Sequence, residues 1–486
     1  MNITKIATKI APKIVTRAKI KRKYSVAAVT VGCKVNQYDT STILASFEKF
    51  GFCIQNFADF PPADIYIVNT CTVTNIGSKK SRQLIGKIYK KAPNAVIVAY
   101  GCYAQVQPQQ LAELSGVSLV IGTQDKHKVA EIVTDFISNN KTNKKPDKAD
   151  KSNEPDKSNE PNEPDKPNKE TPNRQNKTIK HAQQPLNAPQ SSIKNNRTRA
   201  YLKVQDGCDS YCTYCIVPYA RGKPTSIPIK AALKEAKTLT KNGYKEIVLT
   251  GVQISAYGKD TTETLLELIS CIHNIPQLER LRLSSMNPAT ITDDFLQELA
   301  KLPKLCQHFH LSLQSGSNRI LAKMNRHYTT EQFAHIAANI QRYFPQSAIT
   351  TDVIVGFPGE TDEDFADTVQ FVENIGFFRV HVFAYSPKIG TKAATFANQI
   401  SNRTKEHRSK ILRATSAKLT EQFYTKYIGQ TLPVLFETNP AAKIWEGLTS
   451  QYLTVRATST ENLNNQIKLV KTTKFSNNML LGNITE

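Results

Sequence analysis

The stretch GCDSYCTYC at residues 207–215 carries three cysteines in the spacing Cys-x3-Cys-x2-Cys and decides the fold of the central part of the chain. It follows a strand-like apolar run at 201–205, so Cys208, Cys212 and Cys215 lie on the connection that leaves this strand. Barrels of α/β units place their chemistry on such connections. Five more strand-like runs alternate with helix-length segments downstream, at 246–250, 280–284, 308–313, 349–355 and 379–385. Six such units predict a partial or full barrel.

Three thiolates on one short loop can hold one metal centre. A closed [4Fe–4S] cluster takes four cysteine ligands, so three leave one iron open, by the logic that distinguishes open catalytic zinc sites from closed structural ones. The alternative is a structural zinc site, but zinc loops more often contain paired Cys-x2-Cys elements. We therefore interpret Cys208, Cys212 and Cys215 as ligands of an iron–sulfur cluster with an open iron.

Polar residues and glycines also follow the later strands of the predicted barrel. They are Gln253, Arg282, Ser284, Ser285 and Gln314, and, within TDVIVGFPGE at 351–360, Asp352, Gly356 and Glu360. Each alone is a weak signal, because a sequence such as Gly-Phe-Pro-Gly also forms ordinary turns. Their occurrence on successive strands is the stronger observation, and it predicts one site shared with the three cysteines.

Three further cysteines, Cys33, Cys71 and Cys102, lie far apart in sequence, yet each follows a predicted parallel strand. The strand-like runs of this α/β domain are at 25–31, 64–68, 95–99 and 117–121, with helical patterns between them, such as 40–50 and 78–91. Parallel strands end at one sheet edge, where open α/β folds bind ligands. We predict a second three-cysteine cluster there; the alternative is three ordinary core cysteines. The other cysteines, Cys53, Cys271 and Cys306, are interpreted as structural.

The net charge of +23 suggests a polyanionic partner, but its distribution weakens that inference. Residues 1–24 hold eight basic and no acidic residues, and residues 141–200 hold fourteen basic and eight acidic ones, so these segments carry +14 of the total. Residues 139–196 are rich in Lys, Asn, Pro, Asp and Glu and predict a disordered linker. We interpret residues 1–24 as a basic extension, the alternative being a transit peptide.

The last sixty residues change character. The stretches GQTLPVLFE, YLTVRA and NQIKLVKT predict short strands and hence a small all-β barrel at 427–486. Its net charge of +1 makes it a weak electrostatic docking surface. The preceding helical segment at 403–427 either contacts phosphates or is a solvated face, through Arg403, Lys405, Arg408, Lys410 and Arg413. The predicted domains are thus 25–138, 197–426 and 427–486. The sequence contains no run of about 18 apolar residues, so no membrane span is expected.

The chain resembles the radical S-adenosylmethionine (SAM) methylthiotransferases over nearly its whole length, apart from residues 1–24 and the linker. The resemblance rests on GCKVNQYD, VNTCTVTN, KKSRQ, AYGCYAQ, GCDSYCTYCIVPYARG, LTGV, RLSS, HLSLQSGS, KMNRHYT, DVIVGFPGETDEDF and HVFAYSP. It implies an N-terminal cluster domain, a radical SAM domain and a C-terminal TRAM-like module that binds RNA. Two departures stand out: Asn287 where the family commonly has Glu, and Ala384 where it commonly has Pro.

The resemblance also implies cofactors and a mechanism. The cofactors are two [4Fe–4S] clusters and SAM, with Tyr214 at the adenine region of SAM and the Ile354-x-Gly356-x3-Glu360 spacing as the fifth-strand SAM motif. Reductive cleavage of SAM at the Cys208 site would generate a 5′-deoxyadenosyl radical, while the cluster at Cys33, Cys71 and Cys102 would carry or activate sulfur. A second SAM would supply the methyl group.

Within this family the words GCKVNQYD and NTCTVTN are most similar to enzymes acting on N6-threonylcarbamoyladenosine at position 37 of tRNA. The expected partners are the tRNA anticodon loop, an electron donor such as flavodoxin or ferredoxin, and a sulfur donor that the sequence does not identify; the expected location is the cytoplasm. The family alternatives are isopentenyl-adenosine in tRNA and an aspartate of a ribosomal protein. A different class of alternative is a non-catalytic, zinc-containing RNA-binding protein.

Overall fold

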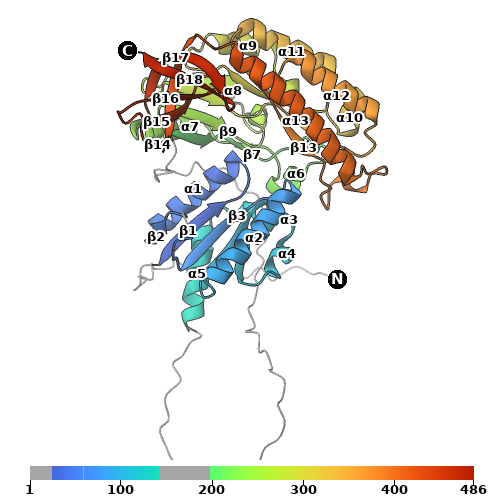
Figure 1. Ribbon diagram of the computed structural model, residues 1–486. Coiled ribbons are helices and arrows are strands. Elements are labelled where there is room, and N and C mark those ends of the chain that lie inside the picture. The colour runs from blue at the N-terminus through green and yellow to red at the C-terminus, as the bar shows by residue number, and fades with distance from the viewer. Residues whose placement is uncertain (1–23, 58–59, 143–197, 486) are drawn as a thin grey trace, which may run out of the picture.

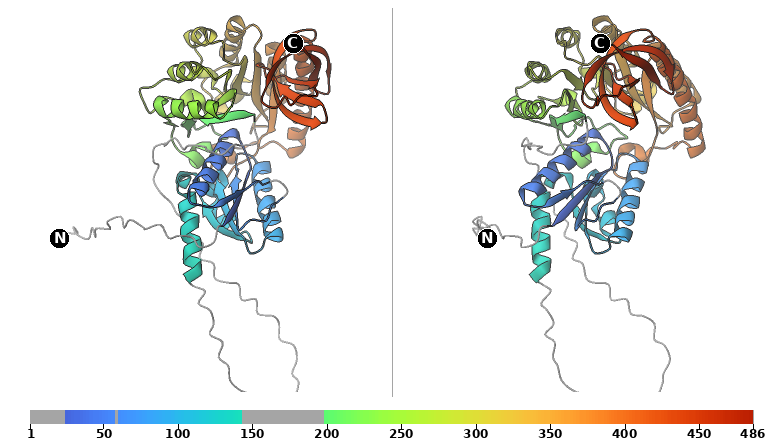
Figure 2. Two further views of the ribbon diagram at one scale, coloured as in Figure 1. Left: turned by 90° about the vertical axis from the view of Figure 1, so that its left-hand side faces the viewer. Right: turned by 60° about the vertical axis from the view of Figure 1, so that its left-hand side comes forward.

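A computed structural model describes residues 24–57, 60–142 and 198–485 (Figure 1). The predicted extension at 1–24, apart from Tyr24, and the predicted linker beyond Thr142 lie outside the described residues. An N-terminal α/β domain packs against a larger barrel domain, and a small β-barrel at the C-terminus lies on one flank of the larger domain (Figures 1 and 2). None of the described helices is long and apolar enough to cross a membrane.

The N-terminal domain is an open parallel sheet in the order β2-β1-β3-β4-β5. Its strands are β1 (Ser25–Thr30), β2 (Cys53–Gln55), β3 (Ile65–Thr70), β4 (Val96–Gly101) and β5 (Val117–Ile121). Helices α1 (Lys34–Lys49) and α5 (Val129–Thr142) pack on one face. Helices α2 (Asn75–Lys91), α3 (Cys102–Val106) and α4 (Pro108–Ala112) pack on the other. The predicted open sheet is confirmed, and it gains the short strand β2, which the sequence did not predict.

The central domain is a partial barrel of six parallel strands. They form two three-stranded sheets, β6-β9-β10 and β11-β12-β13, linked by isolated bridges between Leu281 and Leu305 and between Met286 and Leu311. The strands are β6 (Arg199–Lys203), β9 (Glu246–Thr250), β10 (Arg280–Leu283), β11 (His308–Gln314), β12 (Ala348–Val355) and β13 (Arg379–Ala384). All six predicted strands are present, and the barrel is partial because β6 and β13 are not paired with each other.

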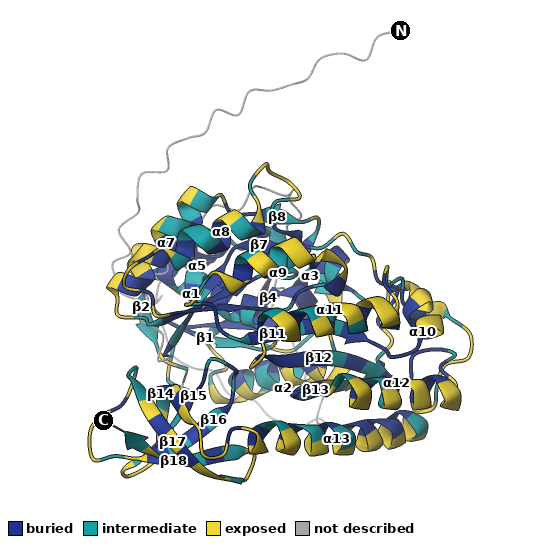
Figure 3. Ribbon diagram, turned by 90° about the horizontal axis from the view of Figure 1, so that it is seen from above, coloured by how far each residue is buried: buried dark blue, intermediate teal, exposed yellow. Residues whose placement is uncertain are grey.

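Helices connect and cover these strands. They are α6 (Val217–Arg221), α7 (Ile229–Lys241), α8 (Leu265–His273), α9 (Asp293–Ala300), α10 (Asn318–Lys323), α11 (Thr330–Tyr343), α12 (Asp362–Ile375) and α13 (Asn402–Thr425). The short strands β7 (Gln205–Asp206) and β8 (Thr225–Ser226) pair antiparallel. Short 3-10 turns lie at Thr123–Asp125, Ile254–Ala256, Pro288–Thr290 and Lys392–Thr395. Helix α13 turns one buried face to the molecule and an exposed face outward (Figure 3).

The C-terminal domain is a closed five-stranded barrel in the order β14-β15-β16-β18-β17. Its strands are β14 (Thr431–Ala441), β15 (Ile444–Leu448), β16 (Thr454–Thr458), β17 (Ile467–Ser476) and β18 (Met479–Thr485). Its core includes Val434 and Val455 and continues into the central domain through Phe378 and Tyr424. The predicted all-β barrel is confirmed, with β15 and β18 in addition to the three predicted strands.

Buried arginines tie this barrel to the central domain. Arg282 pairs with Glu246 at 2.7 Å, and its guanidinium also donates to the carbonyl oxygen of Thr449 at 3.1 Å. Arg280 donates to the carbonyl oxygen of Pro433 at 2.6 Å. From the sequence, Arg282 was grouped with the strand-end polar residues of the site. That placement was wrong, because its side chain points toward the C-terminal barrel and makes its hydrogen bonds at this junction.

A buried network of charges joins the N-terminal and central domains. Lys203 contacts both Asp39 of α1 and Asp206 of β7. Arg221 of α6 bridges the same two carboxylates at 3.1 and 2.9 Å, and Lys126 pairs with Asp206 at 2.5 Å. Paired charges of this kind fix the relative position of two elements, because breaking one pair leaves a buried charge uncompensated. The network therefore sets where the two cysteine groups stand relative to each other.

Candidate active site

The loop that carries Cys208, Cys212 and Cys215 runs from β7 to α6 and has a rigid backbone. Gly207, with φ +76°, precedes it, and a Cβ there would lie 1.9 Å from the carbonyl oxygen of Lys223. The Cys208 N–H donates to the carbonyl oxygen of Gly222 at 2.9 Å. Only glycine fits this entry, so the loop begins in a fixed direction.

The segment after α10 holds the other end of the loop. Thr213 donates its N–H to the carbonyl oxygen of Met324 at 3.1 Å and its hydroxyl to that of Lys323 at 2.8 Å. The Asn325 amide donates to the carbonyl oxygens of Ser210 and Tyr211 at 3.2 and 3.3 Å. Residues from the far half of the barrel thus clamp the cysteine loop.

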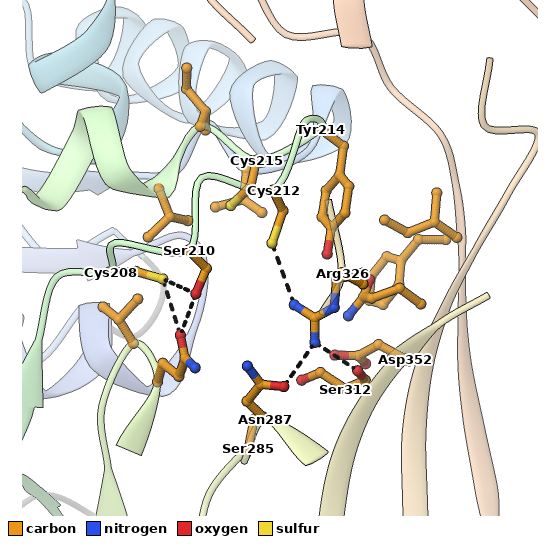
Figure 4. A pocket seen from close by; sticks show the side chains of 18 of the residues that line it. Cys208, Ser210, Cys212, Tyr214, Cys215, Ser285, Asn287, Ser312, Arg326 and Asp352 are labelled. Atoms are coloured by element: carbon orange, nitrogen blue, oxygen red, sulfur yellow. Dashed lines mark hydrogen bonds between the residues drawn. The ribbon is translucent and has the colours of Figure 1, made fainter. Parts of the chain in front are cut away.

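The three thiols border a cavity of about 300 Å³ at the strand ends of the barrel (Figure 4). The same cavity is lined by five of the other residues predicted from the sequence: Tyr214, Gln253, Ser285, Gln314 and Asp352. Cys208 donates to Gln253 Oε1 at 3.1 Å, and Asp352 accepts a hydrogen bond from His310 at 3.1 Å. A cavity of this size with converging polar groups is typical of a small-molecule site.

Gly356 and Glu360 lie outside the lining of this cavity. Glu360 is buried, accepts the Gly356 N–H at 2.6 Å and pairs with Arg408 of α13 at 2.6 Å. A Cβ on Gly356, where φ is +70°, would lie 2.3 Å from the Lys405 side chain. These groups brace the turn after β12 against α13. Arg408 and Lys405 are therefore buried against this turn. Of the five basic residues singled out in this helical segment, only Arg403, Lys410 and Arg413 are exposed.

The structure adds Arg326, which sequence reasoning missed as a site residue. Its guanidinium donates to Cys212 Sγ at 3.4 Å, to the carbonyl oxygen of Ser312 at 3.0 Å and to Asn287 Oδ1 at 3.5 Å (Figure 4). Nearby phenol and thiol groups raise the pKa of Arg326 although burial opposes them. Its only sequence signal was its place in the stretch KMNRHYT. Asn287 and Ala384, the two departures, also line the cavity.

Cys33, Cys71 and Cys102 converge at the carboxyl edge of the N-terminal sheet. They follow β1, β3 and β4, which are neighbours in the sheet. A Cβ on Gly32 would lie 3.2 Å from Cys71 Sγ. Burial raises the pKa of Cys102 to about 11, opposed by Arg221 and reinforced by the Cys33 and Cys71 thiols. The order of the strands in the sheet therefore brings the three cysteines to one edge, as the sequence predicted.

The two cysteine groups share surroundings. Val73 and Thr74, directly after the Cys71 region, line the cavity that the three barrel cysteines border. Arg221 of the barrel domain donates to Asn36 Oδ1 at 2.6 Å, next to Cys33. A reactant in the cavity would thus meet barrel residues and, from the N-terminal domain, Val73 and Thr74.

The donor sets fit iron–sulfur clusters. Among the described residues, no three His, Cys, Asp or Glu side chains converge as ligands of a single metal ion. A [4Fe–4S] cluster makes a different demand, because each thiolate binds its own iron. Three neighbouring thiols suit that demand, and each set would leave one iron for a further ligand.

Comparison with known proteins assigns the family. The chain is 35% identical over 93% of its length, and 94% of the relative, to the threonylcarbamoyladenosine tRNA methylthiotransferase MtaB of Bacillus subtilis. The chain belongs to the radical SAM tRNA methylthiotransferases. The MtaB of Aquifex aeolicus is 37% identical, covering 84% of this chain and 92% of the relative. A tRNA-2-methylthio-N(6)-dimethylallyladenosine synthase of Methylacidiphilum infernorum is 32% identical, covering 85% of this chain and 84% of the relative.

The family descriptions divide this methylthiotransferase as the fold does. The Radical SAM superfamily matches residues 202–372, and Uncharacterized protein family UPF0004 matches residues 25–122. A solved structure of the radical S-adenosylmethionine methyltransferase TsrM from Kitasatospora setae shares the fold, with a TM-score of 0.54 over 77% of each chain at 14% identity. The enzyme is a radical SAM tRNA methylthiotransferase whose family chemistry uses SAM and [4Fe–4S] clusters.

Proposed function

We propose that this enzyme converts N6-threonylcarbamoyladenosine at position 37 of tRNA into its 2-methylthio derivative. The observation that carries the proposal is a cavity that one three-cysteine group borders and that residues directly after Cys71 of the other group also line. One group lies on the barrel loop and the other at the N-terminal sheet edge, with Val73 and Thr74 of the second domain reaching into the cavity of the first. A reaction that needs radical generation and sulfur delivery at one carbon requires two such centres side by side.

Cys208, Cys212 and Cys215 would hold the radical-generating cluster, and Cys33, Cys71 and Cys102 the cluster that handles sulfur. The cofactors, when bound, supply a 5′-deoxyadenosyl radical, a sulfur atom and a methyl group. The chain's own residues bind and orient the reactants: Tyr214, Gln253, Ser285, Gln314 and Asp352 line the SAM side of the cavity. Gly356 and Glu360 would act behind this lining by fixing the turn after β12.

Exposed aromatic residues support a nucleobase as the substrate. Tyr211 on the cysteine loop and Tyr219 on α6 are each about half exposed, with ring centroids 6.0 Å apart. Phe383 lines the cavity and is 42% exposed. Single-stranded RNA loops present unstacked bases to such rings. We infer that these residues receive the anticodon loop and that the C-terminal TRAM-like barrel contributes further RNA contacts.

We place the reaction in the cytoplasm with the tRNA, with flavodoxin or ferredoxin as electron donor and the sulfur donor open. Relatives of this chain carry both the threonylcarbamoyl and the dimethylallyl names, and those cited with the first name have the higher identities. Methylthiolation of isopentenyl-adenosine or of a ribosomal-protein aspartate is the family alternative.

Mass spectrometry of tRNA nucleosides from a deletion strain tests the substrate. We expect 2-methylthio-N6-threonylcarbamoyladenosine to disappear, its unmodified precursor to accumulate and the isopentenyl-derived nucleoside to be unaffected. Persistence of the threonylcarbamoyl product, in a strain without a second such enzyme, would refute this assignment. Metal analysis of anaerobically prepared protein tests the non-catalytic zinc alternative: about four irons per three-cysteine site support the enzyme, and stoichiometric zinc contradicts it.

A further inference from the structure

A second cavity lies beside the first, between the N-terminal and central domains. Its volume is about 210 Å³, and Ile216 lines both cavities. One wall consists of Thr72, Asn75 and Ser78, which follow Cys71 into the first turn of α2; the opposite wall consists of residues 387–389, which follow β13. The second cavity therefore adjoins the N-terminal cysteine edge and the reaction cavity together.

Two cations face this second cavity. Lys388 is only 7% exposed, and its ammonium donates to Asn75 Oδ1 at 2.8 Å. Arg82 of α2 donates to the Tyr103 hydroxyl at 2.8 Å. Among the described residues that line the cavity, none is Asp or Glu. Two cations beside a polar cavity that lacks a carboxylate leave a net positive charge, and such a charge is stabilised by an anionic ligand.

The uncompensated charge shows in the behaviour of Lys388. The pKa of Lys388 is lowered to about 8, chiefly by burial; the Cys71 thiol acts in the opposite direction, and the neighbouring Arg82 guanidinium in the same direction as burial. The remaining lining is uncharged: it combines the polar side chains of residues such as Gln107 and Gln110 with the apolar Val106, Ile216, Pro387 and Ile389. Amides of this kind complete the hydrogen bonds of a ligand that carries both a carboxylate and a hydroxyl group.

We propose that this second cavity binds the carboxylate and hydroxyl of the threonylcarbamoyl substituent on N6 of the target adenosine, with Lys388 and Arg82 pairing with the carboxylate. The proposal rests on the proposed function and names the part of the enzyme that recognises the substituent. An isopentenyl substituent has no polar atom, so a cationic, amide-lined cavity would leave its own groups unpaired around it. The enzyme would then favour the threonylcarbamoyl over the isopentenyl substituent, because the latter leaves buried polar groups of the cavity unpaired.

The test compares Lys388→Gln and Arg82→Gln with the wild-type holoenzyme on tRNA that carries N6-threonylcarbamoyladenosine at position 37. Loss of one charge-assisted hydrogen bond predicts a fall in kcat/KM of about 10- to 100-fold, chiefly through KM. Lys79→Gln removes an exposed cation of α2 that does not line the cavity, and we expect it to behave like the wild type. Iron content and thermal unfolding of every variant check that clusters and fold are intact.

A second arm separates the substituent carboxylate from an RNA phosphate as the bound anion. Binding of tRNA with unmodified adenosine at position 37 should be equal for the wild type and Lys388→Gln. The free nucleoside N6-threonylcarbamoyladenosine should bind the wild type more tightly than its neutral methyl ester, and Lys388→Gln should abolish that difference. Equal weakening of both tRNAs would overturn the proposal in favour of phosphate binding.

The outcomes also separate this proposal from the function on which it rests. If the wild type does not modify the threonylcarbamoyl tRNA, the proposed function fails and this inference fails with it. If the wild type modifies that tRNA and both cation variants do so with unchanged KM, only the recognition proposal fails. A variant with low iron content would be replaced by the milder Lys388→Arg, for which the proposal predicts retention of the preference for the acid over the ester.

Discussion

At the scale of single residues, glycines control the approach to the cysteines. Gly101, with φ +108°, immediately precedes Cys102, and a Cβ there would lie 2.5 Å from Asn69 Oδ1 and 2.7 Å from the Thr70 carbonyl oxygen. A side chain would therefore require both an unfavourable backbone conformation and a shift of β3. The strand-to-helix turn that aims the thiol depends on the absence of a Cβ.

Gly101→Ala should consequently destabilise the protein by about 1–3 kcal/mol and lower the iron bound at the N-terminal site. The matched control is Gly86→Ala in α2, where a Cβ meets nothing within 4 Å; it should stabilise the helix by about 0.5–1 kcal/mol. Urea unfolding and iron analysis measure both effects. Equal stability of the two variants would show that the turn tolerates a side chain.

The two cysteine groups should fail in different ways. Cys212→Ala should abolish SAM cleavage, because Cys212 borders the SAM-side cavity. Cys71→Ala should retain formation of 5′-deoxyadenosine and lose sulfur insertion, because Cys71 belongs to the other edge. Chromatography of 5′-deoxyadenosine and of tRNA nucleosides distinguishes the steps. Loss of SAM cleavage in both variants, with folding intact, would contradict this division of tasks.

Sequence patterns placed many site residues because topology fixes them. Residues at the ends of parallel strands must share one edge, so Cys33, Cys71 and Cys102, and the lining residues Gln253 and Ser285, could be predicted without coordinates. Arg326 and Lys388 could not. Each lies in an irregular loop after a helix or strand, and the direction of its side chain depends on hydrogen bonds to a distant segment. For Arg326 the loop is held by the bond between Met324 and Thr213, and for Lys388 by its own bond to Asn75.

At the scale of elements, helix α1 and helix α7 meet across the domain junction through one buried pair. The Tyr38 hydroxyl donates to both Glu235 carboxylate oxygens at 3.0 Å. Burial raises the pKa of Glu235 from 4.5 to about 7, although the Tyr38 hydrogen bond lowers it. The folded protein thus retains a proton that the unfolded chain releases, and stability falls as pH rises from about 4.5 to about 7.

Glu235→Gln should remove this contribution, which amounts to about 3 kcal/mol over the whole window. The variant should therefore gain stability relative to the wild type as pH increases, with the difference levelling above about pH 7. Tyr38→Phe should extend the decline to higher pH, because the carboxylate loses a hydrogen bond that lowers its pKa. Urea unfolding at several pH values provides the comparison. A constant difference between Glu235→Gln and the wild type from pH 5 to pH 8 would be inconsistent with a raised pKa.

The junction with the C-terminal barrel depends on another buried carboxylate. Glu246→Gln would leave Arg282 without its charged partner and should cost about 3–5 kcal/mol. The control is Glu279→Gln, since Glu279 is 44% exposed where it pairs with Lys245; we expect a change within about 0.5 kcal/mol. Equal unfolding free energies for the two variants would show that the buried pair does not hold the junction.

Strands could be predicted from the sequence where their apolar runs were long enough to be recognised. The six barrel strands and four strands of the N-terminal sheet stand out as strand-like runs in the sequence, and β3 and β9 are buried at every residue. β2 has three residues, and β18 mixes buried and intermediate positions. Their place in a sheet comes from pairing with β1 and β17, which local composition does not encode.

At the scale of the whole molecule, function depends on how two folded domains meet. Each three-cysteine group lies at the strand ends of its own sheet, and the network of Lys203, Arg221, Asp39 and Asp206 locks the two sheets together. The sequence indicated both groups but not this packing, since buried ion pairs between residues 164 and 182 positions apart leave no local pattern. The junction produces the reaction cavity and the cationic cavity beside it.

The most direct test of this account is mass spectrometry of nucleosides from a purified reaction. The anaerobically prepared enzyme, loaded with iron and sulfide, is incubated with SAM, a reductant and tRNA that carries N6-threonylcarbamoyladenosine at position 37. We expect 2-methylthio-N6-threonylcarbamoyladenosine with the wild type and none with Cys71→Ala. Cleavage of SAM by the wild type while the threonylcarbamoyl nucleoside remains unmodified would contradict it.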